Sequence, residues 1–145
     1  MAPLITLLVV AGLARLLGWI SGPEWLDSWQ HATALGLAAM FLLTASAHFQ
    51  QPRRAGLIAM VPPWLPAAPA LVTITGILEL AGAIGLLVPA TSRLAAAALL
   101  VLLLVMFPAN VRAARADLGI KTMPLSLRTV VQALFVGACV VVTLA

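Results

Sequence analysis

One acidic residue stands inside an apolar stretch where water cannot solvate it. Glu79 lies near the middle of the run from Val61 to Pro89, which opens with four prolines in eight residues. A charged side chain at the centre of a bilayer costs about 2.5–3.5 kcal/mol on insertion scales, so an acid in this setting marks a functional site by default. A buried carboxyl can act as a general acid or base. It can also be a neutral group that hydrogen-bonds a neighbouring helix, and the sequence leaves both roles open.

Further polar side chains are expected in the same half of the molecule as Glu79. They lie near the ends of apolar runs and are His48, Asn110, Arg128 and Gln132. Arg128 and Gln132 are four residues apart and therefore share one helix face. At 100° per residue, the face that carries Glu79 also carries Val72, Thr75, Gly76 and Ala83. Small residues such as Gly76 permit close helix approach or leave room for a ligand.

The cost of exposing a carboxyl to hydrocarbon predicts that Glu79 points into the bundle. We expect it to face Arg128 and Gln132. By helix rise Arg128 lies about 10 Å shallower than Glu79, so contact through Gln132 or water is favoured over an ion pair. His48 and Asn110 are predicted to form the cytoplasmic rim of this network. Each of these residues also has a purely structural explanation, as an interfacial anchor or, for Asn110, as a cap for carbonyls freed by Pro108.

Composition excludes several classes of protein. The chain is 63% hydrophobic and 8% charged, whereas soluble domains carry about 25% charged residues. Its basic residues stand at the ends of apolar runs and not in a stripe, so no nucleic-acid partner is expected. Cys139 is the sole cysteine, which excludes a thiol–disulfide relay within the chain. His48 and Glu79 alone are too few ligands for a metal site, and no metal is expected.

The pattern of apolar runs predicts one all-α domain over residues 1–145, a polytopic transmembrane helix bundle. A transmembrane helix needs about 20 apolar residues. The runs that meet or approach this length are 3–20, 31–49, 69–88, 92–112 and 125–145, and residues 50–68 form a proline-rich loop expected at the interface. The first run, interrupted by Arg15, is the weakest of the five.

Loop charges predict the orientation of these spans. If all five cross, the N-terminus and the loops 50–68 and 113–124 share one side. That side carries Arg53, Arg54, Arg112, Arg115, Lys121 and Arg128, and the other side carries Arg15, Glu24, Asp27 and Arg93. The positive-inside rule then puts the N-terminus inside and the C-terminus outside a cytoplasmic membrane.

Several spaced motifs resemble one known family. The segments HF, MVPPWLP, ITGILELAGAIGLLVPATSR, MFPANV and LRTVVQ, spread between His31 and Leu144, are similar to the DoxX-like family of small bacterial inner-membrane proteins. Members usually have four helices, so the resemblance implies a four-helix core to which the run 3–20 is an addition. The residues that match the family pattern are His48 with Phe49, Pro62, Pro63 and Pro66, Gly76, Glu79, Pro108, Asn110, Arg128 and Gln132. The family name comes from an association with thiosulfate and quinol oxidation, and other relatives are tied to redox stress or membrane-protein assembly.

Three functional hypotheses follow from the residues and the resemblance. The first is an accessory subunit of a membrane redox system that binds a lipophilic molecule, quinone-like or a lipid, with a quinone as the possible cofactor. The second is a membrane isomerase or hydrolase in which Glu79 is the general acid or base, although no catalytic motif is present. The third is an assembly factor that docks a partner membrane protein. The lipid bilayer is the common surrounding of all three, and the oligomeric state is open.

Overall fold

A computed structural model describes residues 1–20, 25, 27–116, 118–119 and 123–145, and in these ranges every regular element is an α-helix. The elements are α1 (Ala2–Ile20), α2 (Trp29–Phe49), α3 (Arg53–Met60), α4 (Ala68–Leu87), α5 (Ser92–Arg115) and α6 (Leu125–Leu144). All but α3 are long and apolar enough to cross a membrane. The predicted all-α bundle is confirmed, and the chain is a multi-pass membrane protein.

The helix boundaries agree closely with the predicted spans because apolar runs and prolines determine both. The largest difference is at α5, which continues to Arg115 and so extends beyond the predicted 92–112. The loop predicted over 50–68 contains the short helix α3, which ends just before Pro62 and Pro63. Pro69 stands in the first turn of α4, where the missing amide hydrogen costs no helical hydrogen bond.

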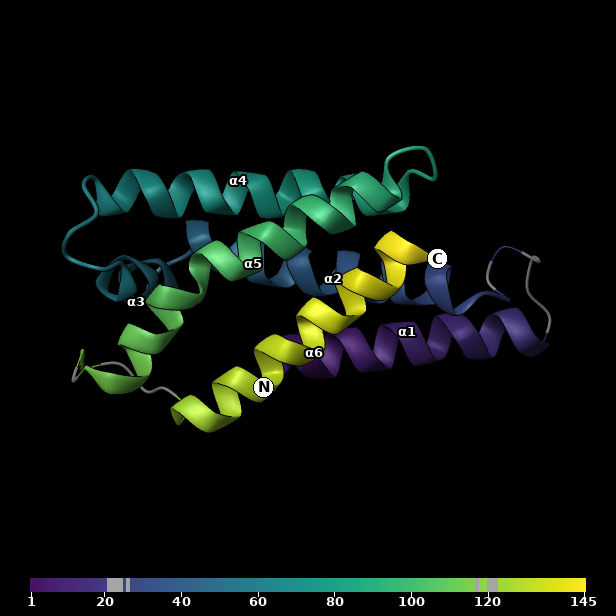
Figure 1. Cartoon of the computed structure of the whole chain (residues 1–145), viewed down its shortest axis with the longest axis horizontal. Coiled ribbons are helices and arrows are strands. Elements are labelled where there is room, and N and C mark those ends of the chain that lie inside the picture. Colours follow the sequence, from purple (N-terminus) through teal and green to yellow (C-terminus); the bar gives the residue numbers. More distant parts are fainter. Residues whose placement is uncertain (21–24, 26, 117, 120–122) are drawn as a thin grey trace.

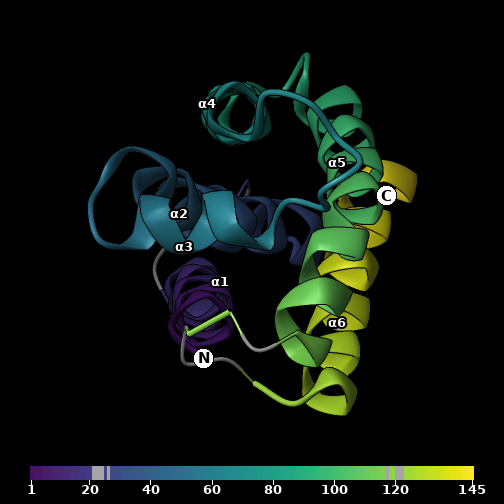
Figure 2. The ribbon, with the colours of Figure 1, turned by 90° about the vertical axis from the view of Figure 1, so that its left-hand side faces the viewer.

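Helix α2 is the centre of the bundle. It contacts α1, α3, α4 and α6, while α5 packs against both α4 and α6. The end-on view in Figure 2 shows α2 between α1 and α4, with α5 and α6 side by side beyond it. The most completely buried large side chains come from α2 and from the helices around it: Leu37, Met40, Phe41, Leu86, Leu99, Cys139 and Val142.

The N-terminal helix is attached to α2 by close backbone contact. A Cβ atom on Gly36 would lie 2.7 Å from the carbonyl oxygen of Leu7 and 2.9 Å from the Cβ of Ala11. At the end of α1, Arg15 forms an ion pair with Asp27, and its guanidinium lies 5.4 Å from the ring centroid of Trp29. The helix predicted as an addition is therefore packed on the core helix.

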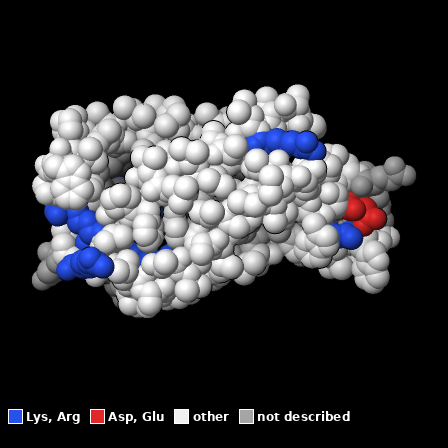
Figure 3. All heavy atoms as spheres, in the orientation of Figure 1, with Lys and Arg blue, Asp and Glu red and all other residues white. Residues whose placement is uncertain are grey.

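Charged side chains occupy two separate regions along the long axis. Figure 3 shows one region at the left end and the other spread over the right half, with a band without charged side chains between them on the face in view. Helix α3, the N-terminal ends of α4 and α6 and the C-terminal end of α5 lie at one end of the molecule (Figure 1). Arg53, Arg54, Arg112 and Arg115 belong to these segments. Glu24 and Lys121, which were part of the predicted charge pattern, lie outside the described residues.

The contact at Gly36 yields a stability prediction. Gly36→Ala is expected to destabilise the protein by about 1–3 kcal/mol, because the new methyl group must push the Leu7 carbonyl away. The melting temperature in detergent measures this loss of stability, and light scattering of the same samples detects aggregation. Gly12→Ala is the matched control in α1, since nothing lies within 4 Å of its added Cβ. Equal melting temperatures for both variants would contradict this account of the α1–α2 contact.

Candidate functional site

Glu79 is buried in α4 on the side that faces α2. Its exposed fraction is 4%, and the hydroxyl of Thr44 in α2 donates a hydrogen bond of 2.7 Å to its Oε2 atom. The same hydroxyl lies 3.2 Å from the carbonyl oxygen of Phe41. A hydroxyl has one proton and two acceptor positions, so Thr44 can donate to a carboxylate, or accept from a carboxylic acid while it donates to its own helix.

His48 is the second buried polar group at this position. It follows Thr44 by one helical turn, and its exposed fraction is 3%. Its Nδ1 atom lies 3.8 Å from Oε2 of Glu79, which is longer than a hydrogen bond. Nδ1 is buried and has no hydrogen-bond partner. Two titratable side chains therefore lie side by side in the bundle without a direct bond between them.

Gly76 makes this arrangement possible. A Cβ atom on Gly76 would lie 2.6 Å from the Cβ of His48, 2.9 Å from its Cγ and 3.1 Å from Cε2 of Phe49. Any side chain at this position would force α4 away from α2 and separate Glu79 from Thr44. The predicted face of α4 is confirmed in this respect, since Val72, Gly76, Glu79 and Ala83 are all buried.

A cavity of about 250 Å³ lies next to His48. Its walls come from α3, from the proline-rich segment after α3, and from α4 and α5. Most lining residues are apolar, and the polar ones are His48, Thr75 and Asn110. The hydroxyl of Thr75 already donates to carbonyl oxygens of its own helix, those of Leu71 and Val72. His48 and Asn110 are therefore the polar groups best placed to orient a molecule in the cavity.

Arginine side chains fix the helix that closes the cavity. Arg54 of α3 donates to the carbonyl oxygen of His48 at 2.5 Å, to that of Pro69 at 3.1 Å and to the hydroxyl of Thr73 at 2.9 Å. From α5, Arg112 donates to the carbonyl oxygen of Ala59 at 3.4 Å. Helix ends leave carbonyl groups without helical partners, and Arg54 satisfies one of those at the end of α2, the carbonyl of His48. From the sequence, both arginines were predicted only to set the orientation of the spans.

The predicted network between Glu79 and α6 is wrong. Gln132 donates its hydrogen bond of 2.7 Å to the carbonyl oxygen of Leu103 in α5, and Arg128 donates one of 2.7 Å to Oδ1 of Asn110. Helix α5 lies between α4 and α6 in both ribbon views (Figures 1 and 2). The physical reason is that α4 and α6 both pack against α5, so Arg128 and Gln132 find their partners on α5 and not on α4.

The six predicted site residues thus divide into two groups. His48, Gly76 and Glu79 meet at the α2–α4 contact, while Arg128 and Gln132 bond to α5. Asn110 connects the groups, because it accepts from Arg128 and also lines the cavity beside His48. Thr44 was not among the predicted site residues, although its spacing of four residues from His48 puts both on one face of α2 and could have indicated it. Within the described ranges no group of three or more metal-ligating side chains occurs.

The hydrogen bond between Thr44 and Glu79 yields a second stability prediction. Thr44→Val is expected to lower the free energy of unfolding by about 1–3 kcal/mol, because it leaves a buried carboxyl without its partner. The melting temperature in detergent measures the loss. Thr143→Val is the matched control, since that hydroxyl donates only within α6, to the carbonyl oxygen of Cys139. An unchanged melting temperature for Thr44→Val would show that the bond does not stabilise the fold.

Comparison with known proteins places the chain in a family. No curated protein and no solved structure matches it. Residues 37–143, from the middle of α2 almost to the end of α6, match the family described as Domain of unknown function (DUF8561). This range includes every residue of the site described above and leaves out α1. Since it is well over half of the chain, the protein belongs to the family Domain of unknown function (DUF8561).

Proposed function

We propose that this protein binds a lipophilic molecule with a hydrogen-bonding head group, of the quinone type, as an accessory subunit of a membrane redox system. The observation that carries the proposal is the cavity beside His48, in which apolar walls meet the two polar side chains His48 and Asn110. Small-molecule sites combine mainly apolar lining with a few polar groups that fix orientation. A quinone ring, apolar with two carbonyl acceptors, has this same distribution of polarity.

The size of the cavity limits what it can hold. Ligand pockets range over about 300–1,000 Å³, so a volume of about 250 Å³ is suited to a single ring and not to a large soluble substrate. Four of the lining residues come from the proline-rich segment after α3: Val61, Pro62, Trp64 and Leu65. Asn110 offers amide hydrogens to a carbonyl acceptor, while its own Oδ1 is occupied by Arg128. The resemblance to the DoxX-like family, with its association with quinol oxidation, agrees with this assignment.

A second candidate function rests on the spacing of Glu79 and His48. Two buried titratable groups 3.8 Å apart could pass a proton to or from a molecule in the cavity, as an isomerase, a hydrolase or a quinone-reducing site requires. The candidates differ in their dependence on Glu79. Proton handling requires its titration, whereas simple binding does not, because Glu79 is not a lining residue of the cavity.

The proposed location is the cytoplasmic membrane, with the arginine-rich end that carries α3 on the cytoplasmic side. The positive-inside rule supports this orientation, because Arg53, Arg54, Arg112 and Arg115 lie in segments at that end. The N-terminus is then inside and the C-terminus outside. The cavity beside His48 would open near the cytoplasmic surface, where the ring of a quinone meets the polar layer of the bilayer.

Quinone binding can be followed through a single tryptophan. Trp64 lines the cavity, whereas Trp19, Trp25 and Trp29 lie at or near the connection of α1 to α2. With these three replaced by Phe, decylubiquinone is expected to quench Trp64 saturably. His48→Ala should weaken binding about tenfold, the effect of losing one hydrogen bond of about 1.4 kcal/mol.

Two controls make the binding result decisive. A variant that keeps Trp29 and carries Trp64→Phe should show only linear quenching by quinone dissolved in the micelle. Glu79→Gln should bind decylubiquinone as the native chain does if the site only binds, and should abolish any pH dependence of binding if the site handles protons. Identical quenching curves for Trp29 and Trp64, together with no quinone in mass spectra of the purified protein, would refute the proposed function.

Cysteine labelling tests the orientation. In a Cys139→Ala background, single cysteines at positions 53 and 115 are expected to be protected from a membrane-impermeant maleimide added to whole spheroplasts, while one at position 93 is labelled. All three positions are exposed side chains, so detergent-treated samples should label at each and serve as the control. Labelling of positions 53 and 115 from outside would show that the orientation is the reverse of the proposed one.

A further inference from the structure

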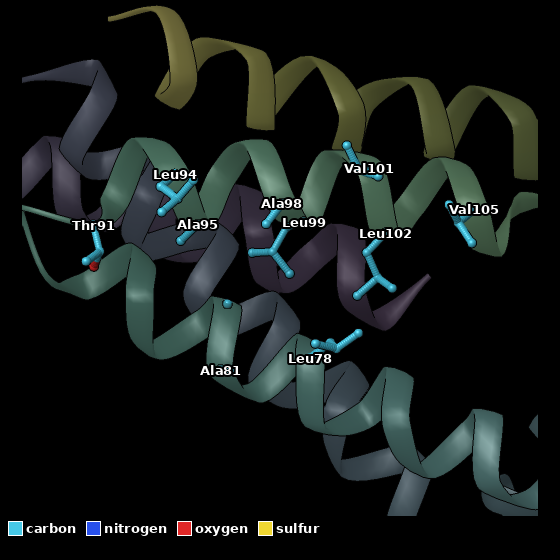
Figure 4. Close-up of a pocket in the computed structure, with 11 residues that line it drawn as sticks. Leu78, Ala81, Thr91, Leu94, Ala95, Ala98, Leu99, Val101, Leu102 and Val105 are labelled. Atoms are coloured by element: carbon cyan, nitrogen blue, oxygen red, sulfur yellow. The ribbon is translucent and has the colours of Figure 1, made fainter.

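A second apolar depression lies between α4 and α5. This groove has a volume of about 520 Å³ and is lined by residues of those two helices and of the turn that joins them. Figure 4 shows Leu78 of α4 and Leu102 of α5 pointing toward one another across it. Small side chains create the space, including Ala81 and Gly82 on α4 and Ala98 on α5.

The groove continues the cavity beside His48. Val105 lines both depressions. On α4 the cavity is lined by Leu71 and Thr75, and the groove begins one turn further at Leu78. On α5 the groove reaches Val105, and the cavity continues with Met106 and Ala109. The two depressions are therefore consecutive parts of one helix–helix seam, with polar groups at one end only.

The length and exposure of the groove define what fits it. From Leu94 to Val105 the α5 helix advances about 16 Å at 1.5 Å per residue, close to the roughly 15 Å that one leaflet contributes to the hydrocarbon core. Leu94, Val101 and Val105 are 73%, 57% and 68% exposed, so the groove is open toward the lipid along its side. A linear hydrocarbon chain can enter it laterally and lie along it.

We infer that the α4–α5 groove holds the hydrocarbon tail of the molecule whose head group occupies the cavity beside His48. The inference rests on the proposed function and adds the class of ligand: an amphiphile with one long linear tail, oriented with its head at Asn110 and its tail end toward Thr91. The hydroxyl of Thr91 donates to the carbonyl oxygen of Gly85 at 2.9 Å. That end of the groove therefore presents no free polar group to the tail.

The groove should distinguish ligands by their hydrocarbon tail and not by their head group. Since a tail leaves one hydrocarbon phase for another, its gain is close packing against the groove walls and not release from water. Filling the groove removes that gain. Ala98→Phe is expected to weaken binding of decylubiquinone about tenfold. Binding of the tail-less 2,3-dimethoxy-5-methyl-1,4-benzoquinone should not change, because Ala98 does not line the cavity. Trp64 quenching measures both affinities.

Matched variants distinguish the effect of filling the groove from a general effect of added bulk on binding. Ala133→Phe adds the same bulk at an exposed position of α6 and should leave both affinities unchanged. Ala81→Phe fills the groove from α4 and should repeat the Ala98→Phe result, which covers the case that one variant fails to fold. Decylubiquinone with a diazirine at the end of its tail should label the segment 91–98 after irradiation.

The outcomes distinguish this inference from the proposed function. Equal affinity of the tailed probe for Ala98→Phe, Ala81→Phe and the native chain would overturn the inference alone, as would labelling of α1 or α6 by the tail probe. Failure of both quinones to bind the native chain would overturn the proposed function. Labelling of segment 91–98 without saturable Trp64 quenching would show that the groove takes a hydrocarbon tail while no head group occupies the cavity, and would also refute the inference.

Discussion

The contact between α2 and α4 is the constraint on which the rest of the structure depends. A carboxyl cannot face hydrocarbon without a large cost, so Glu79 fixes the rotation of α4 about its axis. Gly76 then lets α4 approach until Glu79 reaches Thr44. Once this face is turned inward, the adjacent α4 residues Thr75 and Leu78 must lie toward α5. The position of one acid thus determines where the cavity and the groove can form.

The fold was predictable from the sequence because hydropathy acts locally, whereas the partners of the site residues were not. Long apolar runs must cross as helices, and the prediction that Glu79 is buried needs only the cost of its exposure. Which helix it faces depends on how the helices pack around one another. Hydropathy did not show that α5 separates α4 from α6, or that Gln132 bonds to the Leu103 carbonyl near Pro108. The bond from Thr44 to Glu79 was not predicted, because the hydroxyl of a threonine in a helix usually bonds a carbonyl of its own helix.

The loop arginines have two roles, one in the orientation of the spans and one in bonding the ends of helices. Loop arginines set orientation through the positive-inside rule, and this use needs only their presence on one side of the membrane. Arg54 and Arg112 also donate to carbonyl oxygens at the ends of α2 and α3. A guanidinium has five donors in a planar fork, so Arg54 can bind the carbonyl oxygens of His48 and Pro69 and the hydroxyl of Thr73 together. A sequence shows the charge but not the acceptors.

The two sides of the cavity differ in how firmly they are held. Helices α4 and α5 contribute buried side chains to the core, whereas α3 has none. It is held by the hydrogen bonds of Arg54 and Arg112 and by contacts of partly buried residues. Segments with few buried apolar contacts open at lower free energy than the core. On the proposed function, the head group therefore exchanges past α3 while α4 and α5 stay packed against one another. A ligand whose tail lies along the seam between α4 and α5 is held by the stable part of the fold and released through the weaker part.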